Sequence, residues 1–261
     1  MDAFINYVLN SQNLKNRVFV SNPPFPALLI WTNARNVTSI TGISVVKQLN
    51  SEGYQGIKAE ILINIIRHQI RKHVPLLYIE YHPQMEYMII EKKRYTLNDA
   101  ANYISSAFNV SIGDSPAKKP NDKEQIKDPF HIWSRDAFDG KLVTKTDIDL
   151  LIINENRISA LLECKRSKKV PVGKWTPYVN PNEDNDISNY LMAMTFCEYL
   201  NTTFYTVHHD VIGQMTMNDT QKIDVFTYKP QNKLPNLDTL NKFASNNNRL
   251  ITNVSNFVQS L

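Results

Sequence analysis

Four charged residues stand in segments that otherwise read as buried β-structure. Asp147 and Asp149 begin the apolar run DIDLLIIN, and Glu163 and Lys165 lie near the end of the run RISALLECKR. A buried carboxylate or ammonium group is costly unless it is paired or binds a metal ion. These charged side chains therefore either form buried ion pairs with one another or take part in a chemical reaction.

The alternation of side chains along a strand predicts how these charges meet. Residues two apart share a face, so Asp147 points with Asp149, and Glu163 points with Lys165. The tight turn NEN between the two runs predicts a hairpin, which brings an aspartate of one strand toward Glu163 on the other. Mg²⁺ prefers oxygen ligands and usually takes one or two carboxylates with water and phosphate. The spacing thus predicts a site for Mg²⁺ or Mn²⁺ at a sheet edge.

Carboxylates that hold a metal ion beside an ammonium group suit the hydrolysis of a phosphodiester. The metal ion lowers the pKa of a bound water and neutralises charge that grows on the phosphate. The lysine orients the water, helps to deprotonate it, or stabilises the transition state electrostatically. No covalent intermediate is needed, and a phosphodiester fits such a site better than a peptide or a glycoside.

The pattern of an aspartate followed by LLECK resembles the signature of the PD-(D/E)xK nuclease superfamily, which has the restriction-endonuclease-like fold. The matching residues are Asp149, Glu163 and Lys165, although the proline of the signature is absent. The resemblance implies that Asp149 and Glu163 bind the metal ion and that Lys165 positions the water. Asp147 is the candidate for an auxiliary metal ligand.

The resemblance also implies a core that runs helix, three strands, helix, strand. Tyr190 and Asp186, on the segment DISNYLMAMTFCEYL, match the place where many members carry a tyrosine or glutamine near the active site. Asp186 differs from the more usual glutamine. Many members also carry a glutamate on the first core helix as an extra metal ligand, and Glu60 is the candidate for that role.

Hydrophobic periodicity predicts a mixed α/β layout around the motif. We expect helices at 56–73, 96–108 and 186–200, and a helix at 38–50 after a strand at 27–32. Further strands are expected at 75–83, 86–95, 130–138, 202–209 and 222–230. The predicted fold is α/β, with a restriction-endonuclease-like core in which helices flank a central mixed β-sheet, and with an N-terminal extension. Residues 1–118 form the N-terminal α/β part, which can supply the first core helix at 56–73, and residues 119–261 form the nuclease core.

Basic and aromatic residues follow the motif directly. Lys168, Lys169 and Lys174 are candidates for phosphate contacts, which make binding dependent on salt. Trp175 is a candidate for stacking on bases. A solvated basic loop explains the same residues equally well.

Composition limits the class of protein. The chain has 261 residues, of which 42% are hydrophobic and 21% charged, as in an ordinary globular protein. A net charge of +4 is compatible with nucleic-acid binding but does not indicate it. The apolar runs are too short to span a membrane, the N-terminus lacks the features of a signal peptide, and two cysteines are too few for a disulfide framework. We therefore expect a cytoplasmic protein without membrane contact.

These observations predict a Mg²⁺-dependent nuclease that acts on DNA as an endonuclease. A homodimer would supply the two active sites that cutting two strands requires. An RNA endonuclease of the same fold has the same catalytic residues, and a non-catalytic nucleic-acid-binding module is the alternative in another class. A metabolic α/β enzyme lacks support, because the chain has neither a glycine-rich phosphate loop nor a G-x-S-x-G motif.

Overall fold

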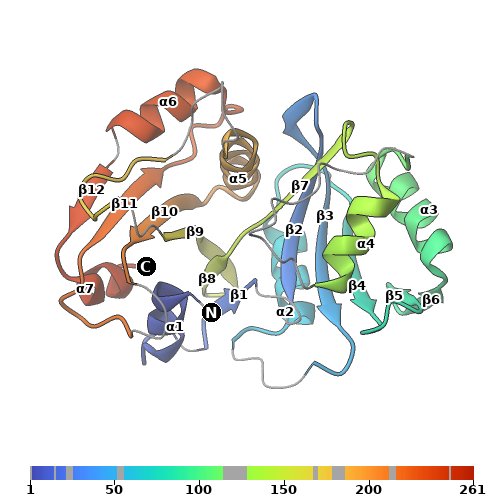
Figure 1. Cartoon of the computed structure of the whole chain (residues 1–261), viewed down its shortest axis with the longest axis horizontal. Coiled ribbons are helices and arrows are strands. Elements are labelled where there is room, and N and C mark those ends of the chain that lie inside the picture. The colour runs from blue at the N-terminus through green and yellow to red at the C-terminus, as the bar shows by residue number, and fades with distance from the viewer. Residues whose placement is uncertain are drawn as a thin grey trace.

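The computed structural model describes residues 2–14, 16–21, 26–51, 56–113, 128–166, 170–177, 186–211, 216–246 and 248–261. These residues form two six-stranded sheets and seven helices (Figure 1). Each sheet contains one parallel pair of strands among antiparallel pairs, so both sheets are mixed. The predicted α/β class is confirmed, but the strands are divided between two sheets instead of one.

The first sheet has the strand order β1-β8-β9-β10-β11-β12. Helices α5 (Ile187–Leu200) and α6 (Leu237–Asn246) pack on one of its faces, and α1 (Ala3–Asn10) and α7 (Val254–Gln259) pack on the other (Figure 1). Its strands are β1 (Val18–Val20), β8 (Leu150–Asn154), β9 (Arg157–Arg166), β10 (Thr203–His209), β11 (Ile223–Tyr228) and β12 (Asn248–Ile251).

The second sheet has the strand order β6-β5-β4-β3-β2-β7. Helices α3 (Leu97–Phe108) and α4 (Pro129–Ala137) pack on one face, and α2 (Ala59–Gln69) packs on the other. Its strands are β2 (Ala27–Asn33), β3 (Asn36–Gln48), β4 (Leu76–Tyr81), β5 (Met88–Ile90), β6 (Lys93–Tyr95) and β7 (Val143–Asp147).

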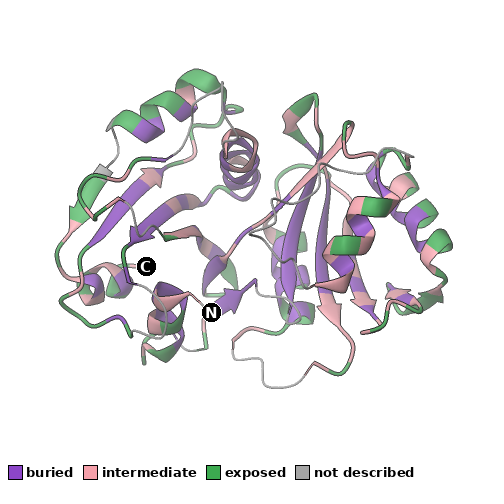
Figure 2. Cartoon of the chain, in the orientation of Figure 1, coloured by how far each residue is buried: buried purple, intermediate pink, exposed green. Residues whose placement is uncertain are grey.

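One hydrophobic core joins the two sheets. It contains Leu62 and Ile66 of α2 and Met194 of α5, together with residues of β2, β3, β9 and β10. Most of the buried residues of the strands lie in the inner strands of both sheets, whereas the exposed residues gather on the outer helices and turns (Figure 2). Within the described ranges, no helix is long and apolar enough to cross a membrane.

The second sheet is inserted between two neighbouring strands of the first. The chain leaves the first sheet after β1, builds the second sheet, and returns from β7 to β8, which pairs with β1. Only Ile148 and Asp149 separate β7 from β8. The predicted division at residues 118 and 119 therefore cuts across both sheets, since β1 lies in the first sheet and β7 in the second.

The predicted helices at 56–73, 96–108 and 186–200 correspond to α2, α3 and α5. The predicted hairpin is formed by β8 and β9, which pair Leu150 with Leu162. Its turn residues Glu155 and Asn156 both have positive φ angles of 49° and 59°, which suits a tight turn between twisted strands.

Two of the predicted elements are of the wrong type, and the predicted strand at 86–95 is divided into β5 and β6 by a turn at residues 91–92. Residues 38–48 lie in strand β3 instead of a helix, because β-branched residues such as Ile43, Val45 and Val46 favour a pleated, buried surface. Residues 130–137 lie in helix α4 instead of a strand. The Asp128 carboxylate caps this helix by accepting a hydrogen bond from the backbone N–H of His131 at 2.8 Å, and Pro129 suits the first turn.

Gln69, at the end of α2, joins that helix to the first sheet. Its Nε2 donates to the carbonyl oxygens of Ile158, at 2.9 Å, and Leu200, at 3.0 Å. The backbone N–H of Ile158 donates to Gln69 Oε1 at 2.7 Å. One amide side chain thus satisfies backbone groups of β9 and α5 at the same time.

The substitution Gln69→Leu keeps the size of the side chain but leaves these backbone groups without partners. We expect the free energy of unfolding to fall by about 1–3 kcal/mol, as measured by urea denaturation. Gln259→Leu is the control, because the hydrogen bond of this exposed glutamine to a described residue stays within α7, to Ser255 at 3.2 Å. Equal stabilities of the two variants would contradict the role given to Gln69.

Candidate active site

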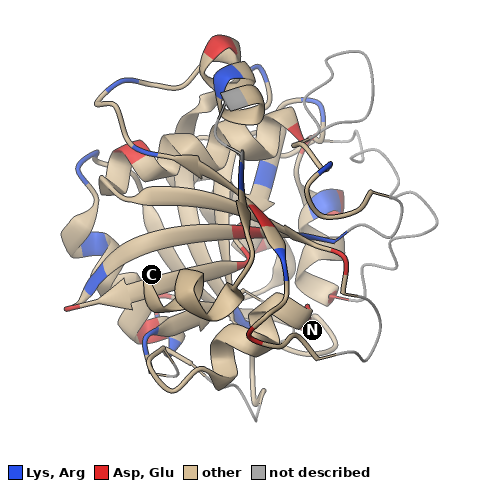
Figure 3. Ribbon diagram, turned by 90° about the vertical axis from the view of Figure 1, so that its left-hand side faces the viewer, with Lys and Arg blue, Asp and Glu red and all other residues tan. Residues whose placement is uncertain are grey.

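The charged residues of the motif lie where the chain passes from the second sheet to the first. Asp147 ends β7, Asp149 directly precedes β8, and Glu163 and Lys165 lie near the end of β9. Leu150 and Leu162 form the last pair of the hairpin register, and Asp149 and Glu163 are the residues next to this pair. Acidic segments meet near the middle of Figure 3, where the strands of the two sheets come together.

Two backbone hydrogen bonds fix Asp149. Its carboxylate oxygen Oδ2 accepts a hydrogen bond from the backbone N–H of Cys164 at 2.6 Å. Its carbonyl oxygen accepts one from the N–H of Ser21, directly after β1, at 2.9 Å. Asp149 is therefore held between the two strands that flank β8, with its carboxylate on the side of β9.

Lys165 forms two ion pairs. Its Nζ lies 3.0 Å from Glu163 Oε1 and 2.8 Å from Asp186 Oδ2, at the start of α5. The ammonium group also lies 5.8 Å from the centre of the Tyr190 ring. The side chains of Lys165, Glu163 and Asp186 are 24%, 17% and 35% exposed, so a ligand can reach them from solvent.

Enclosure of the carboxylates disfavours their charged forms. Burial, against the opposing charge of Lys165 and together with the charge of Asp147, raises the pKa of Glu163 to about 7. Burial, and then the negative charges of Glu163 and Asp147, raise the pKa of Asp149 well above its usual range. It is therefore unfavourable for Asp149 and Glu163 to be ionised at the same time.

Lys165 and Tyr190 differ in what they can do. Burial lowers the pKa of Lys165, but the negative charges of Glu163 and Asp186 outweigh this effect and raise the pKa, so the ammonium group stays protonated near neutral pH. Burial raises the pKa of Tyr190. Tyr190 is 1% exposed and packs against Phe204 and Phe243, so it supports Lys165 with its ring.

The carboxylate oxygens of this cluster are the type of ligand that a divalent cation prefers, and their negative charge is opposite to that of the cation. Asp147, Asp149 and Glu163 act on one another electrostatically, and Lys165 offsets only part of their charge. Among the described residues, no group of three or more His, Cys, Asp or Glu side chains is arranged as a ready metal site. Mg²⁺ needs only one or two carboxylates and completes its shell with water, so Asp149 and Glu163 suffice, with Asp147 beside them.

The structure does not bring Glu60 to this cluster. Glu60 lies in the first turn of α2, is exposed, and its Oε1 accepts a hydrogen bond from the hydroxyl of Tyr78 at 2.9 Å. The charges that act on it are those of Lys47 and Lys58. Helix α2 turns its apolar face to both sheets, which leaves Glu60 on the outer face beside β4.

The basic segment after β9 is described only in part. Lys168 and Lys169 lie outside the described residues, whereas Lys174 is exposed. Trp175 stacks on His208, with ring centres 4.7 Å apart, and meets Phe226 edge-on at 5.4 Å. One face of its indole is therefore covered by protein, and stacking of a base on the other face stays a prediction.

The segment that carries Trp175 is docked beside the cluster. His208 is paired with Lys165 in the register of β9 and β10, and its Nδ1 lies 3.2 Å from Asp224 Oδ2. The backbone N–H of Gly173 donates to both carboxylate oxygens of Asp224, at 2.9 and 3.0 Å. Sequence reasoning missed this buried His–Asp pair, for which the only signal was the alternation that puts His208 on the same strand face as Thr206.

Sequence reasoning also did not foresee that Asp186 pairs with Lys165. The position of Asp186 just before α5 was recognised, but the ion pair depends on how α5 crosses β9. That crossing is a tertiary contact which no local pattern encodes.

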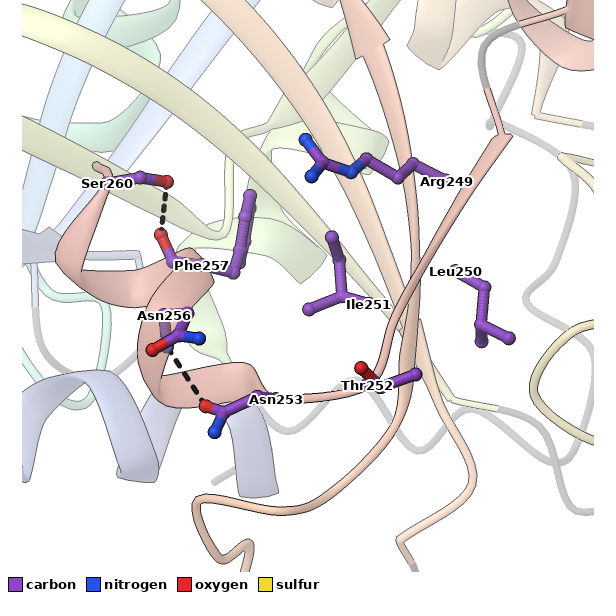
Figure 4. A pocket seen from close by; sticks show the side chains of 8 residues that line it. All are labelled: Arg249, Leu250, Ile251, Thr252, Asn253, Asn256, Phe257 and Ser260. Atoms are coloured by element: carbon purple, nitrogen blue, oxygen red, sulfur yellow. Dashed lines mark hydrogen bonds between the residues drawn. The ribbon is translucent and has the colours of Figure 1, made fainter.

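A separate hollow lies on the edge of the first sheet (Figure 4). Its volume is about 280 Å³, and its walls include Arg249 and Ile251 of β12 and Asn253, Asn256 and Phe257 around α7. None of the described residues that line it is acidic, and β10 and β11 separate β12 from β9. It therefore offers no alternative to the carboxylate cluster as an active site.

Comparison of the chain with family models, curated proteins and solved structures finds no match. The resemblance to the PD-(D/E)xK superfamily thus stays a prediction that rests on the motif.

The raised pKa of Glu163 predicts a pH-dependent stability in the absence of metal. Because the pKa in the folded state is about 7 and the ordinary value is 4.5, the native state binds this proton more tightly than the unfolded state. The free energy of unfolding should therefore fall as pH rises from 4.5 to about 7. In EDTA, Glu163→Gln should be more stable than the wild type at pH 8, by roughly 1–3 kcal/mol, and the difference should vanish near pH 4.5.

Urea denaturation at both pH values measures this difference. Glu155→Gln, in the exposed turn before β9, is the control and should leave the pH dependence unchanged. A Glu163→Gln variant that loses stability at pH 8 would contradict the account.

Proposed function

We propose that the chain is a metal-dependent nuclease that hydrolyses phosphodiester bonds in DNA. The observation that carries the proposal is the convergence of Asp149, Glu163 and Lys165 at the sheet junction, with Lys165 Nζ 3.0 Å from Glu163 Oε1. Burial disfavours the ionised forms of the two carboxylates, and a bound cation would stabilise these forms. The ammonium group beside them would attract an anionic substrate.

The order of elements supports the proposal. Helix α4, strands β7, β8 and β9, helix α5 and strand β10 follow in the order helix, three strands, helix, strand. The same order arises within the first sheet if α1 and β1 take the places of α4 and β7, because β1 lies beside β8. The first helix of this order is α4 in one alternative and α1 in the other. It is therefore not α2, which corresponds to the helix predicted for that place at 56–73.

The residues of the chain take distinct roles in the proposed reaction. Asp149 and Glu163, with Asp147 beside them, would hold Mg²⁺ or Mn²⁺. When bound, the metal ion would supply an activated water and neutralise charge on the phosphate. Lys165 stays protonated, so it donates hydrogen bonds to the water or to a phosphate oxygen and does not act as a base. Asp186 holds Lys165 in place through their 2.8 Å ion pair.

Cleavage assays test this proposal and identify the polymer. The wild type, Lys165→Ala and Arg157→Ala are each incubated with single-stranded, duplex and branched DNA and with RNA, in Mg²⁺, Mn²⁺ or EDTA. Arg157 is the matched control, since it is exposed at the opposite end of β9. We expect metal-dependent cleavage of DNA by the wild type and by Arg157→Ala, and a loss of about 10²–10³-fold in Lys165→Ala.

Cleavage of RNA alone would assign the same chemistry to the other polymer. Binding without cleavage, unchanged by Lys165→Ala, would contradict the nuclease and favour the non-catalytic module. Gel filtration of the wild type with and without duplex DNA tests the homodimer that double-strand cutting calls for.

A further inference from the structure

A buried polar pair holds part of the segment that follows β9 against the first sheet. Asp224 of β11 and His208 of β10 are both fully buried, and His208 Nδ1 lies 3.2 Å from Asp224 Oδ2. The backbone N–H of Gly173 donates to both oxygens of the same carboxylate, at 2.9 and 3.0 Å. A buried carboxylate is costly unless hydrogen bonds replace those it made to water. The pair therefore fixes the backbone of residues 170–177, which we call the docked segment.

The docked segment is anchored on both sides of Lys174. Before it, Gly173 has a φ of 91°, a conformation that favours glycine. The backbone N–H of Lys174 donates to the carbonyl oxygen of Pro171 at 3.1 Å, which closes a turn. After it, the ring of Trp175 stacks on that of His208, with the two planes 8° apart. The backbone of Lys174 is therefore held in place, although its side chain is exposed.

The docked segment lies beside the carboxylate cluster. In the parallel register of β9 and β10, Glu163 pairs with Thr206, and Lys165 pairs with His208. Paired residues of parallel strands point to the same face of the sheet, and neighbouring strands lie about 4.8 Å apart. His208 is thus the direct neighbour of Lys165, and Trp175 covers His208 on that face. The docked segment therefore borders the cluster on the side of β11.

The two lysines at this border differ in how their charges are balanced. Lys165 forms ion pairs with Glu163 and Asp186. Lys174 is exposed, and no carboxylate of the described residues forms an ion pair with it. A nucleic-acid strand carries a regular row of phosphates, so a strand that places one phosphate at the cluster brings others to its border. Lys174 is therefore suited to bind one of these flanking phosphates.

We propose that His208 and Asp224 are positioning residues, which hold Lys174 where it contacts a phosphate of the strand that enters the carboxylate cluster. The inference rests on the proposed function, because it assigns the nucleic acid to the same site. A segment that is already fixed loses little conformational freedom when the phosphate binds, so the contact is stronger than that of a lysine on a loose loop. Neither His208 nor Asp224 needs to touch the strand.

Binding of a fluorescent single-stranded DNA oligonucleotide, measured by anisotropy in EDTA at several salt concentrations, tests this role. Lys174→Gln removes the contact. Gly173→Ala disturbs the docked segment alone, because the added methyl group meets no atom within 4 Å but a φ of 91° is strained for alanine. Lys233→Gln, which removes the same charge from an exposed position after the far end of β11, is the control. We expect the control to bind like the wild type, and Lys174→Gln and Gly173→Ala to bind about tenfold more weakly, with a salt dependence less steep by about 0.7 in logarithmic slope.

A double-mutant cycle distinguishes positioning from a general loss of structure. Asp224→Ala should weaken binding by the wild type but leave the affinity of the Lys174→Gln protein unchanged, because the contact that Asp224 positions is already lost there. Fold-changes that multiply would show that Asp224 acts independently of Lys174 and would overturn the proposal. Gly173→Ala, combined with Lys174→Gln in the same way, keeps the test valid if Asp224→Ala fails to fold.

The result for this inference is separate from that for the nuclease. Cleavage by the wild type, together with DNA affinities that neither Lys174→Gln nor Gly173→Ala changes, would overturn the positioning role and leave the proposed function intact. Binding that depends on Lys174, in a wild type that cleaves neither DNA nor RNA, would contradict the nuclease and support the positioning role. Absence of DNA binding by the wild type would overturn the positioning role.

Discussion

The repulsion between Asp149 and Glu163 is the constraint on which this site depends. Asp149, directly before β8, feels the negative charge of Glu163 on β9, the charge of Asp147 acts on both carboxylates, and burial raises the pKa of both. Lys165 offsets part of this charge but is shared with Asp186. Such an arrangement disfavours the charged forms of both carboxylates, and this is the ground on which we propose a bound cation.

The insertion of one sheet into the other creates this arrangement. Because β7 belongs to the second sheet and β8 to the first, the chain must cross between sheets at Ile148 and Asp149. Ile148 is buried at the crossing, and Asp149 is tied to the backbone of Cys164. The core that α2 and α5 share with both sheets holds the crossing in place, and Gln69 links those helices to β9.

Which charged residues meet could be predicted from the sequence more fully than the fold around them. Alternation along two short strands was enough to bring Glu163 and Lys165 together and to oppose Asp149 to Glu163, because strand periodicity is a local property. The division into two sheets, the pairing of Lys165 with Asp186 and the remote position of Glu60 depend on tertiary contacts, which no window of sequence contains. Residues 38–50 and 130–138 were misread for a different reason: β-branched residues decided the first, and the Asp128 cap decided the second.

Binding of Mn²⁺, measured by electron paramagnetic resonance, tests the central claim most directly, since it requires neither a substrate nor turnover. We expect that the wild type binds Mn²⁺, that Mg²⁺ displaces it, and that Asp149→Asn and Glu163→Gln each weaken the binding strongly. Glu60→Gln, which changes an exposed carboxylate on α2, should bind like the wild type. Absence of Mn²⁺ binding, or binding that survives both Asp149→Asn and Glu163→Gln, would contradict the account.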